Sequence, residues 1–416
     1  MRKIRNSVLV AAAVTVAGTG AAMAQTAGYQ PFPTQAREYQ AQGARVGSFV
    51  LFPSLSAGVE YNDNTFLRQA NEQSDVIARV SPRIAARSDF SRHQLVLNAG
   101  TEAAFHSNSS DDNTIDYNVG MNAVLEATRD LKIKPKASYR HSHEARGDDN
   151  VNGFSEEPVP FDTVSAGVDV EYLVGRMTIN LLGDVAYRDF EDVALFGGGI
   201  DNQDDRDRVS LSGGLRVGYE FRAGTQIFAE GRYMTTDFDN VDDNFLVKRD
   251  SDEYRILAGV KYSPSAVRTV SLGAGYVSRS FDQAVFSDVD GFAVNGSLAW
   301  AVTPLTRVYG SVERRVDESS QNNAAAELVW SSNLSVRHEL RRNVILGAKV
   351  SYANRLFEGN ASTRDDDVFG AGVQADYYLT KNFSIGAKYD FARRVSTDAN
   401  AGYTQNKVIA TAVARF

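Results

Sequence analysis

The chain has 416 residues, with 44 Lys and Arg against 52 Asp and Glu, a formal net charge of −8 and no cysteine. Without cysteine the chain has no disulfide framework and no thiolate that could serve as a nucleophile or metal ligand. The acidic balance argues against a nucleic-acid partner, and because no apolar stretch after the N-terminal segment approaches eighteen residues, helical membrane spans are excluded.

Residues 1–24 have the pattern of a cleaved signal peptide. Three basic residues precede the apolar run "SVLVAAAVTVAG", and the small residues "AMA" stand directly before Gln25. This combination is typical of a secretory signal. The run is shorter than the roughly twenty apolar residues of a membrane anchor, so we expect the mature chain to begin near Gln25.

Residues 25–47 are predicted to form a flexible periplasmic segment. They are rich in Gln and Ala, contain two prolines and show no strand alternation. Three arrangements stay open: the segment is free in the periplasm, enters the mouth of the domain that follows, or docks a periplasmic export partner.

From about residue 48 onward, apolar and polar residues alternate with period two. Residues 252–281 are representative: Tyr254 and Ile256 lie on one side of an extended chain, and Glu253 and Arg255 lie on the other. A helix would scatter these residues over both faces, so the alternation predicts strands with one apolar and one polar face.

Tight turns separate these strands at regular intervals. Their cores are "RSDFSR" (87–92), "ATRDLK" (127–132), "LVGRM" (173–177), "FRAGTQ" (221–226), "YSPSAV" (262–267), "AVTPLT" (301–306), "ELRRNV" (339–344) and "YLTKNF" (378–383). The spacing of about forty residues indicates repeated hairpins. Longer acidic segments, such as 190–208 and 235–253, lie between the turns.

These features predict an all-β fold, a transmembrane antiparallel up-and-down β-barrel of about eighteen strands over residues 48–416. An even strand number, periplasmic tight turns and long extracellular loops are typical of bacterial outer-membrane barrels. A propeller or β-helix also repeats strands, but its blades would not leave every strand apolar on one face and charged on the other. Aromatic residues near the strand ends resemble membrane-interface girdles: Tyr61, Tyr139, Tyr172, Tyr187, Tyr219, Tyr262, Trp300 and Tyr377.

The opening of the barrel region resembles a known family. The stretches "GSFVLFPSLSAGVEYNDNTF" (47–66) and "SDVIARVSPRIAARSDFSRHQL" (74–95) are similar to the first strand and first turn of the putative β-barrel porin 2 group of outer-membrane proteins. The matching positions are Pro53, Ser54, Leu55, Tyr61, Asp63, Asn64, Ser88, Asp89, Ser91, Arg92 and His93, with Phe90 in place of the usual tryptophan. The resemblance implies a porin-like architecture, and because several members accompany extracellular-polysaccharide genes, it implies an exported polysaccharide as one candidate cargo.

The polar face of the strands carries the candidate selectivity residues. With the apolar face toward lipid, seven basic residues and several carboxylates point into the lumen. The basic ones are Arg79, Arg83, Arg87, Lys132, Lys134, Lys136 and Arg140, and the acidic ones include Asp116, Glu126, Asp169 and Glu171. A basic ladder steers anions through a pore, whereas cross-strand pairing would make the same ladder structural. Both interpretations stay open, as does a plug formed by a loop.

No catalytic site is expected. The chain has five histidines, and only "HSHE" (141–144), with Asp148 and Asp149 following, brings two of them together. We interpret these residues as solvated loop residues because no second cluster completes a catalytic site, and we expect no cofactor and no metal. The acidic loops fit neither EF-hand nor nonapeptide calcium spacing, so they are expected to form a solvated surface facing lipopolysaccharide.

The last residues, "NKVIATAVARF", end inside an apolar strand. Alternate residues from Val408 to Phe416 share one face. In a closed barrel the last strand pairs with the first, which removes the sheet edge. A C-terminal Phe also resembles the signal by which the outer-membrane assembly machinery recognises its substrates, so Phe416 is the candidate assembly signal.

The functional hypothesis is a passive, porin-like outer-membrane channel, not an enzyme. It would pass small hydrophilic solutes or an exported polysaccharide. A polysaccharide conduit should carry sugar-stacking aromatic rings along its lumen, for which Tyr309 and Tyr378 are the candidates. A non-conducting structural barrel with interacting surface loops is the alternative.

Overall fold

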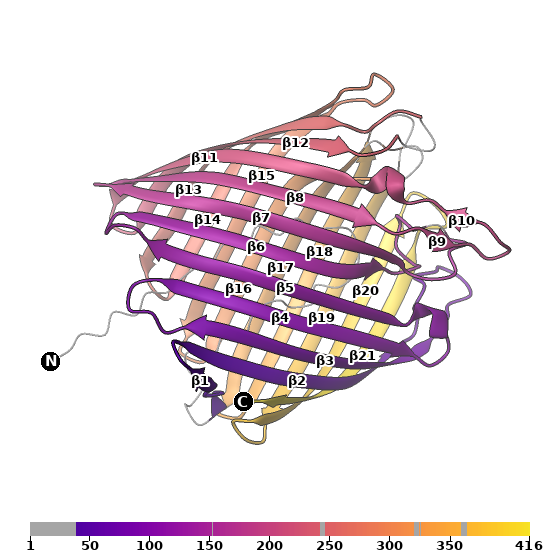
Figure 1. Ribbon diagram of the computed structural model, residues 1–416, viewed down its shortest axis with the longest axis horizontal. Helices are drawn as coiled ribbons and strands as arrows, with labels where there is room; N and C mark the ends of the chain where they lie inside the picture. The colour runs from indigo at the N-terminus through magenta and orange to yellow at the C-terminus, as the bar shows by residue number, and fades with distance from the viewer. Residues whose placement is uncertain (1–38, 152, 242–245, 320–323, 325, 359–363) are drawn as a thin grey trace.

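The computed structural model describes residues 39–416 apart from 152, 242–245, 320–323, 325 and 359–363 (Figure 1). The expected signal peptide and most of the expected periplasmic segment therefore lie outside the described residues. The long strands are β2 (Phe49–Asn62), β3 (Asp75–Ser88), β4 (Gln94–His106), β5 (Thr114–Glu126), β6 (Leu131–Glu144), β7 (Val159–Val174), β8 (Met177–Phe190), β11 (Arg208–Arg222), β12 (Thr225–Phe238), β13 (Ser251–Ser265), β14 (Arg268–Phe281), β15 (Val289–Thr303), β16 (Thr306–Glu318), β17 (Ala326–Arg341), β18 (Val344–Glu358), β19 (Asp365–Tyr378), β20 (Phe383–Ser396) and β21 (Tyr403–Arg415). The short elements are β1 (Ala44–Val46), β9 (Val193–Ala194), β10 (Ile200–Asp201), η2 (Ser110–Asp112) and η3 (Asp204–Arg206).

In the described part of the chain, these eighteen long strands form one closed antiparallel barrel. Each strand pairs with its neighbours along the chain, β8 pairs with β11, and β21 closes the barrel against β2 from Ser54↔Arg415 to Asn62↔Lys407. The predicted strand number and the predicted closure between first and last strands are confirmed. Among the described residues, no helix has the length and apolar character needed to cross a membrane.

All eight tight turns lie where the sequence predicts them, and glycine is required at two. Gly175 between β7 and β8 and Gly224 between β11 and β12 have φ of +60° and +72°. Side chains are disfavoured in this left-handed region. At Gly224 a Cβ would also lie 2.5 Å from the Cα of Pro264 in the neighbouring turn. These glycines therefore keep the turns short and closely packed.

The outer wall is apolar because side chains alternate along every strand. On β14, for example, Leu272 and Tyr276 are about half exposed, whereas Val277 is fully buried. Alternate residues of a strand point to opposite faces. The exposed apolar set therefore faces the lipid, and the intervening residues line the lumen.

β1 covers the part of the seam that β21 does not reach. β21 ends near Pro53, whose carbonyl accepts a 3.1 Å hydrogen bond from the N–H of Phe416. Beyond this point β1 pairs with β2, from Ala44↔Leu51 to Val46↔Phe49. Residues 39–47, which the sequence assigns to the periplasmic segment, thus protect an otherwise unpaired strand edge.

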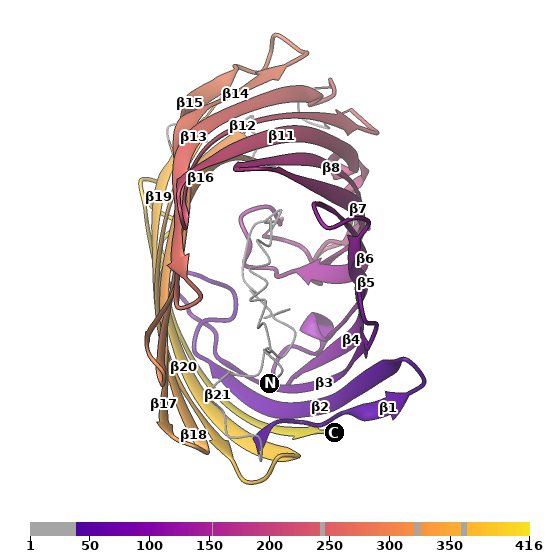
Figure 2. The same cartoon turned by 90° about the vertical axis from the view of Figure 1, so that its left-hand side faces the viewer.

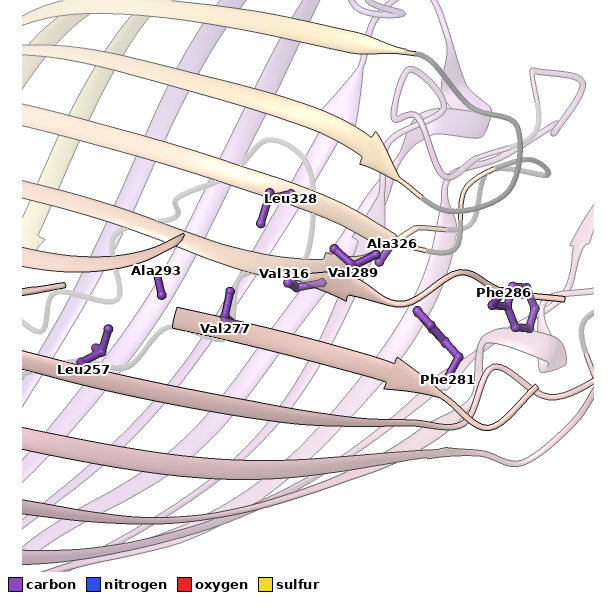
Figure 3. Close-up of a cluster of buried hydrophobic side chains, with 9 residues drawn as sticks. All are labelled: Leu257, Val277, Phe281, Phe286, Val289, Ala293, Val316, Ala326 and Leu328. Atoms are coloured by element: carbon purple, nitrogen blue, oxygen red, sulfur yellow. The ribbon is translucent and has the colours of Figure 1, made fainter. Parts of the chain in front are cut away.

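The loop ends of β16 and β17 turn into the barrel. Pairing of β15 with β16 stops at Val294↔Arg314, whereas β16 and β17 remain paired to Glu318↔Ala326. Leu328 shares a face of β17 with the lipid-exposed Leu334, yet only 3% of it is exposed. It packs in a cluster with inner-wall side chains of β13, β14 and β15 (Figure 3). The nine residues of this cluster are Leu257, Val277, Phe281, Phe286, Val289, Ala293, Val316, Ala326 and Leu328.

Replacing Phe416 with Asp should impair barrel assembly. Phe416 is 61% exposed at the seam, where a charge would meet the membrane interface and weaken the signal read during insertion. We expect a severalfold smaller fraction of heat-modifiable, folded protein in the outer membrane, with secretion to the periplasm unchanged. Val267→Asp, at an exposed position in the tight turn between β13 and β14 and away from the seam, is the control. Normal folding of Phe416→Asp would contradict the assembly role.

Candidate channel lumen

The predicted arginines of β3 lie on the inner wall, and Arg79 and Arg83 are paired with carboxylates. Arg79 Nε lies 3.0 Å from Glu60 Oε2, and its Nη1 lies 3.0 Å from Glu102 Oε1. Arg83 reaches the other oxygen of Glu102 at 3.4 Å. The third arginine, Arg87, lies over the ring of Phe52, 5.2 Å from its centroid. This part of the basic ladder is therefore compensated by glutamates from the strands on either side.

The lysines of β6 are paired in the same way. Lys134 Nζ lies 3.3 Å from Asp169 and 2.7 Å from Glu171, two of the acidic residues predicted for the lumen. Lys132 lies 3.9 Å from Glu126. Arg140 shares this inner face and is exposed, and it makes no ion pair with any residue that the structure describes.

Lys136 forms an ion pair across an intervening strand, with a carboxylate that was not predicted from the sequence. Its Nζ lies 2.6 Å from Asp184 of β8, although β7 runs between them. The bridge passes over Gly167, where a Cβ would lie 2.3 Å from the Asp184 carboxylate and 2.6 Å from the lysine Cε. A glycine flanked by opposite charges two strands apart is the pattern that could have indicated this pair.

The same arrangement recurs on the other side of the barrel. Lys349 of β18 lies 2.9 Å from Asp390 of β20, and the bridge crosses Gly372 of β19. Neighbouring side chains occupy the space beside Gly372, so this inward glycine does not widen the lumen. The lumen charges lie flat along the wall.

A loop crosses the lumen at the end opposite the tight turns. Asp149, in the β6–β7 loop, lies 2.8 Å from Arg364 and 3.6 Å from Arg355, and it also pairs with Arg394. These arginines belong to the wall around β18 to β20. Figure 2 looks along the barrel and shows described loops lying inside the ring of strands. The side chains of Asp149 and Arg394 are only 9% and 8% exposed, so this is a desolvated ion-pair cluster, which we call the Asp149 cluster.

Three neighbouring loops hold the β6–β7 loop in place. Arg146 pairs with Asp112 at 2.6 Å in the β4–β5 loop, and Glu144 pairs with Arg206 of η3 at 2.8 Å. A Cβ at Gly147 would lie 2.7 Å from the backbone of Phe66 in the β2–β3 loop. We call these packed segments, residues 63–74, 107–113, 145–151 and 202–207, the loop layer.

The inward hairpin of β16 and β17 narrows the lumen from another side. Arg279 of the inner wall lies 2.5 Å from Glu318 at the end of β16 and 2.9 Å from Glu253 of β13. Arg249 donates to the carbonyl of Ser319. These buried contacts fix the hairpin against β13 and β14. Two separately anchored parts therefore narrow the lumen, the loop layer and this hairpin.

Parts of the acidic loops are buried, which corrects the prediction of a wholly solvated surface. Asp148, Arg206 and Asp207 are each at most 9% exposed, and the side chain of Asp149 is 9% exposed. The prediction that "HSHE" forms part of a loop is wrong, because these residues are the end of β6. His141 and His143 alternate with the lumen lysines of that strand and therefore point outward. Nothing local in the sequence reveals the Asp149 cluster, since Asp149 and Arg394 are 245 residues apart.

The buried carboxyl of Asp148 has an unusual acidity. Burial, reinforced by the charges of Glu144 and Asp149, raises the pKa of Asp148 to about 7, while the N–H of Ala145 and the charge of Arg355 oppose the shift. A carboxyl whose pKa is raised by folding stabilises the folded arrangement when protonated. That stabilisation is complete below the ordinary pKa of 3.8, falls as the pH rises above that value, and is lost once the pH has passed 7.

Asp207, at the edge of the same layer, behaves similarly. Burial and the charge of Asp189 raise the pKa of Asp207 to about 7, although the N–H of Phe190 donates a 2.7 Å hydrogen bond to it. The loop layer therefore contains two carboxyls that gain charge near neutral pH.

Comparison with known proteins agrees with the architecture. The model of a family described as putative beta-barrel porin 2 matches residues 37–416. No protein with a curated description matches the chain. Solved structures similar to it include the outer membrane protein OpdK of Pseudomonas aeruginosa, with 11% identity and a TM-score of 0.45 over 88% of this chain and 99% of that one. Others are the copper transporter OprC (8%, 0.46, 90% and 81%) and a mutant of the ferric enterobactin receptor PfeA of Pseudomonas aeruginosa (7%, 0.45, 91% and 81%).

Raising the pH should loosen the loop layer through Asp148. Trypsin can cleave after Arg146 only when the layer opens, and mass spectrometry of the fragment beginning at Gly147 measures that rate. We expect the rate for the native protein, divided by that for Asp148→Asn, to be roughly tenfold higher at pH 8.5 than at pH 6. The ratio cancels the pH dependence of trypsin. A ratio that stays constant would contradict the role of Asp148.

Proposed function

Because the chain belongs to the putative beta-barrel porin 2 family, we propose that it forms a passive channel for small hydrophilic solutes. The protein is a porin-like barrel of the outer membrane. The proposal concerns what passes through it and what limits the passage.

The inner wall of paired charges is the observation that carries this proposal. Arg79, Lys134 and Lys136 each pair with carboxylates along the wall rather than across the bore. A wall of this kind stays hydrated, and it presents both donors and acceptors to a polar solute. A barrel that served only as a structural wall would have no need of a polar lining over its full height.

The loop layer is the element that we propose controls the rate of passage. It extends from β6 to the arginines around β18 to β20 through the Asp149 cluster, so a solute entering from the loop side must pass beside it. Removing one partner of a buried ion-pair cluster leaves uncompensated charge and costs about 3–5 kcal/mol. The loop layer can therefore be released by a single substitution.

Polysaccharide export is the weaker candidate because the lumen offers few rings for sugar stacking. Tyr378 is only 6% exposed, and the guanidinium of Arg415 covers it at 4.4 Å from the ring centroid. Tyr309 is 41% exposed and remains the one candidate from the sequence analysis that a sugar could reach. Small solutes need no such rings, and they fit the charged wall better.

Breaking the Asp149 cluster should enlarge the conductance. In planar bilayers we expect Asp149→Asn to conduct at least about twofold more than the native protein, because Arg355 would lose its ion pair with Asp149, and Arg364 and Arg394 would keep only Asp366 as a carboxylate partner within the described part of the chain. Asp89→Asn, which removes an ion-paired aspartate from a tight turn, is the control. If neither the native protein nor Asp149→Asn conducts, the barrel is a non-conducting structural or surface-interaction protein.

The lumen charges should give a weak anion preference. Their field extends over a Debye length of about 8 Å at physiological salt. Changing Lys132, Lys134 and Lys136 together to Gln leaves their carboxylate partners uncompensated, so the reversal potential in a salt gradient should shift toward cation selectivity. Arg140→Gln should have the largest effect of any single change, because Arg140 makes no ion pair within the described part of the chain.

Arg268 provides the matched control for these charge changes, because it lies on the outer wall beside the hydroxyl of Tyr262. Arg268→Gln should leave the reversal potential unchanged. A cation-selective native channel, or a triple variant with native selectivity, would show that the ladder only holds the wall together.

A further inference from the structure

The outer wall carries a cluster of histidine and carboxylate side chains at the loop end of β6, β7 and β8. His141 and His143 alternate with the lumen lysines of β6 and therefore point away from the lumen. His141 lies opposite Asp162 in the pairing of β6 with β7. Glu191 directly follows the last residue of β8. Three segments of the chain thus contribute to one patch outside the channel.

We propose that His141, Asp162 and Glu191 bind a zinc ion. One ligand atom from each residue lies within 4.8 Å of the other two, and within the described part of the chain no other group of three such residues meets this condition. His141 Nδ1 already lies 2.8 Å from Asp162 Oδ1. Glu191 is exposed. Its side chain can therefore move closer to His141 and Asp162 when the ion binds.

The donor set favours zinc over the hard cations. Zinc binds an imidazole nitrogen and carboxylate oxygens at about 2.0–2.2 Å, commonly with four ligands. Calcium and magnesium prefer sites made entirely of oxygen, and imidazole suits zinc and its transition-metal neighbours. Three protein ligands leave one position for water. Binding requires a neutral imidazole, so a proton shared between His141 and Asp162 would be released into solution.

Neighbouring side chains already orient the proposed ligands. The hydroxyl of Tyr139 donates a 3.1 Å hydrogen bond to Asp162, and the ring of Tyr117 stacks on His141 with centroids 4.7 Å apart. The ring of His143 meets the edge of His141 at 5.0 Å. Such partners fix the direction of a metal ligand, and their loss commonly lowers affinity 10- to 100-fold.

The site lies where extracellular ions can reach it. Tyr139 belongs to a series of outer-wall tyrosines that donate to carboxylates near the loop ends of their strands, including Tyr233 to Asp252 at 2.6 Å and Tyr352 to Asp367 at 2.7 Å. Tyrosine marks the membrane interface in barrels of this class. His141 lies beyond Tyr139 on the loop side, at the level of the lipid headgroups or above.

Calorimetric titration of the full-length, detergent-folded barrel with zinc chloride tests the proposal. The protein must be purified without a histidine tag. We expect one zinc ion per chain, at least tenfold weaker binding in His141→Gln and in Asp162→Asn, and weaker binding as the pH falls and the imidazole becomes protonated. His338→Gln removes a histidine near a tight turn, where it contacts Thr306, and should bind zinc as the native protein does.

Three results would overturn the proposal. One is the absence of saturable zinc binding by the native barrel. Another is unchanged binding in both His141→Gln and Asp162→Asn, with heat-modifiable mobility confirming that each variant is folded. The third is displacement of zinc by an equal concentration of calcium, which would show a general acidic surface. None of these results bears on conduction, because the site lies outside the lumen.

Discussion

The need to satisfy every backbone hydrogen bond within lipid is the constraint on which the rest of the structure depends. No water is available in the bilayer core to pair a free strand edge, so the sheet must close. β21 closes it against β2, and β1 takes over where β21 ends. Closure also gives every strand one face toward lipid and one toward the lumen. Successive side chains along a strand therefore face lipid and lumen in turn.

The charges of the lumen follow from that division. Lys136 and Lys349 reach carboxylates two strands away because Gly167 and Gly372 place no side chain where the bridges cross the intervening strands. Such bridges tie three strands together and keep long side chains against the wall. The same residues that line the lumen therefore also stiffen the wall.

The loop end is organised differently, because it lies beyond the lipid and is free of the strand alternation. Buried ion pairs hold the loop layer, and the Asp149 cluster joins it to the opposite wall. Charges this deeply buried are stable only while every partner is present. Loops held in this way can close a pore and still be released by a modest change, which an all-apolar plug would resist.

The period-two pattern by itself determined the strand number, the positions of the tight turns and the face on which Arg79 or Lys134 lies, because these features depend only on neighbours along one strand. It also indicated that carboxylates such as Glu171 could neutralise the lysines. Only the tertiary structure decided that the loop ends of β16 and β17 turn inward, that Asp149 meets Arg394 from 245 residues away, and that His141, Asp162 and Glu191 converge. These contacts join segments that no local periodicity relates, since they arise from the curvature of the closed wall and from loops that cross it.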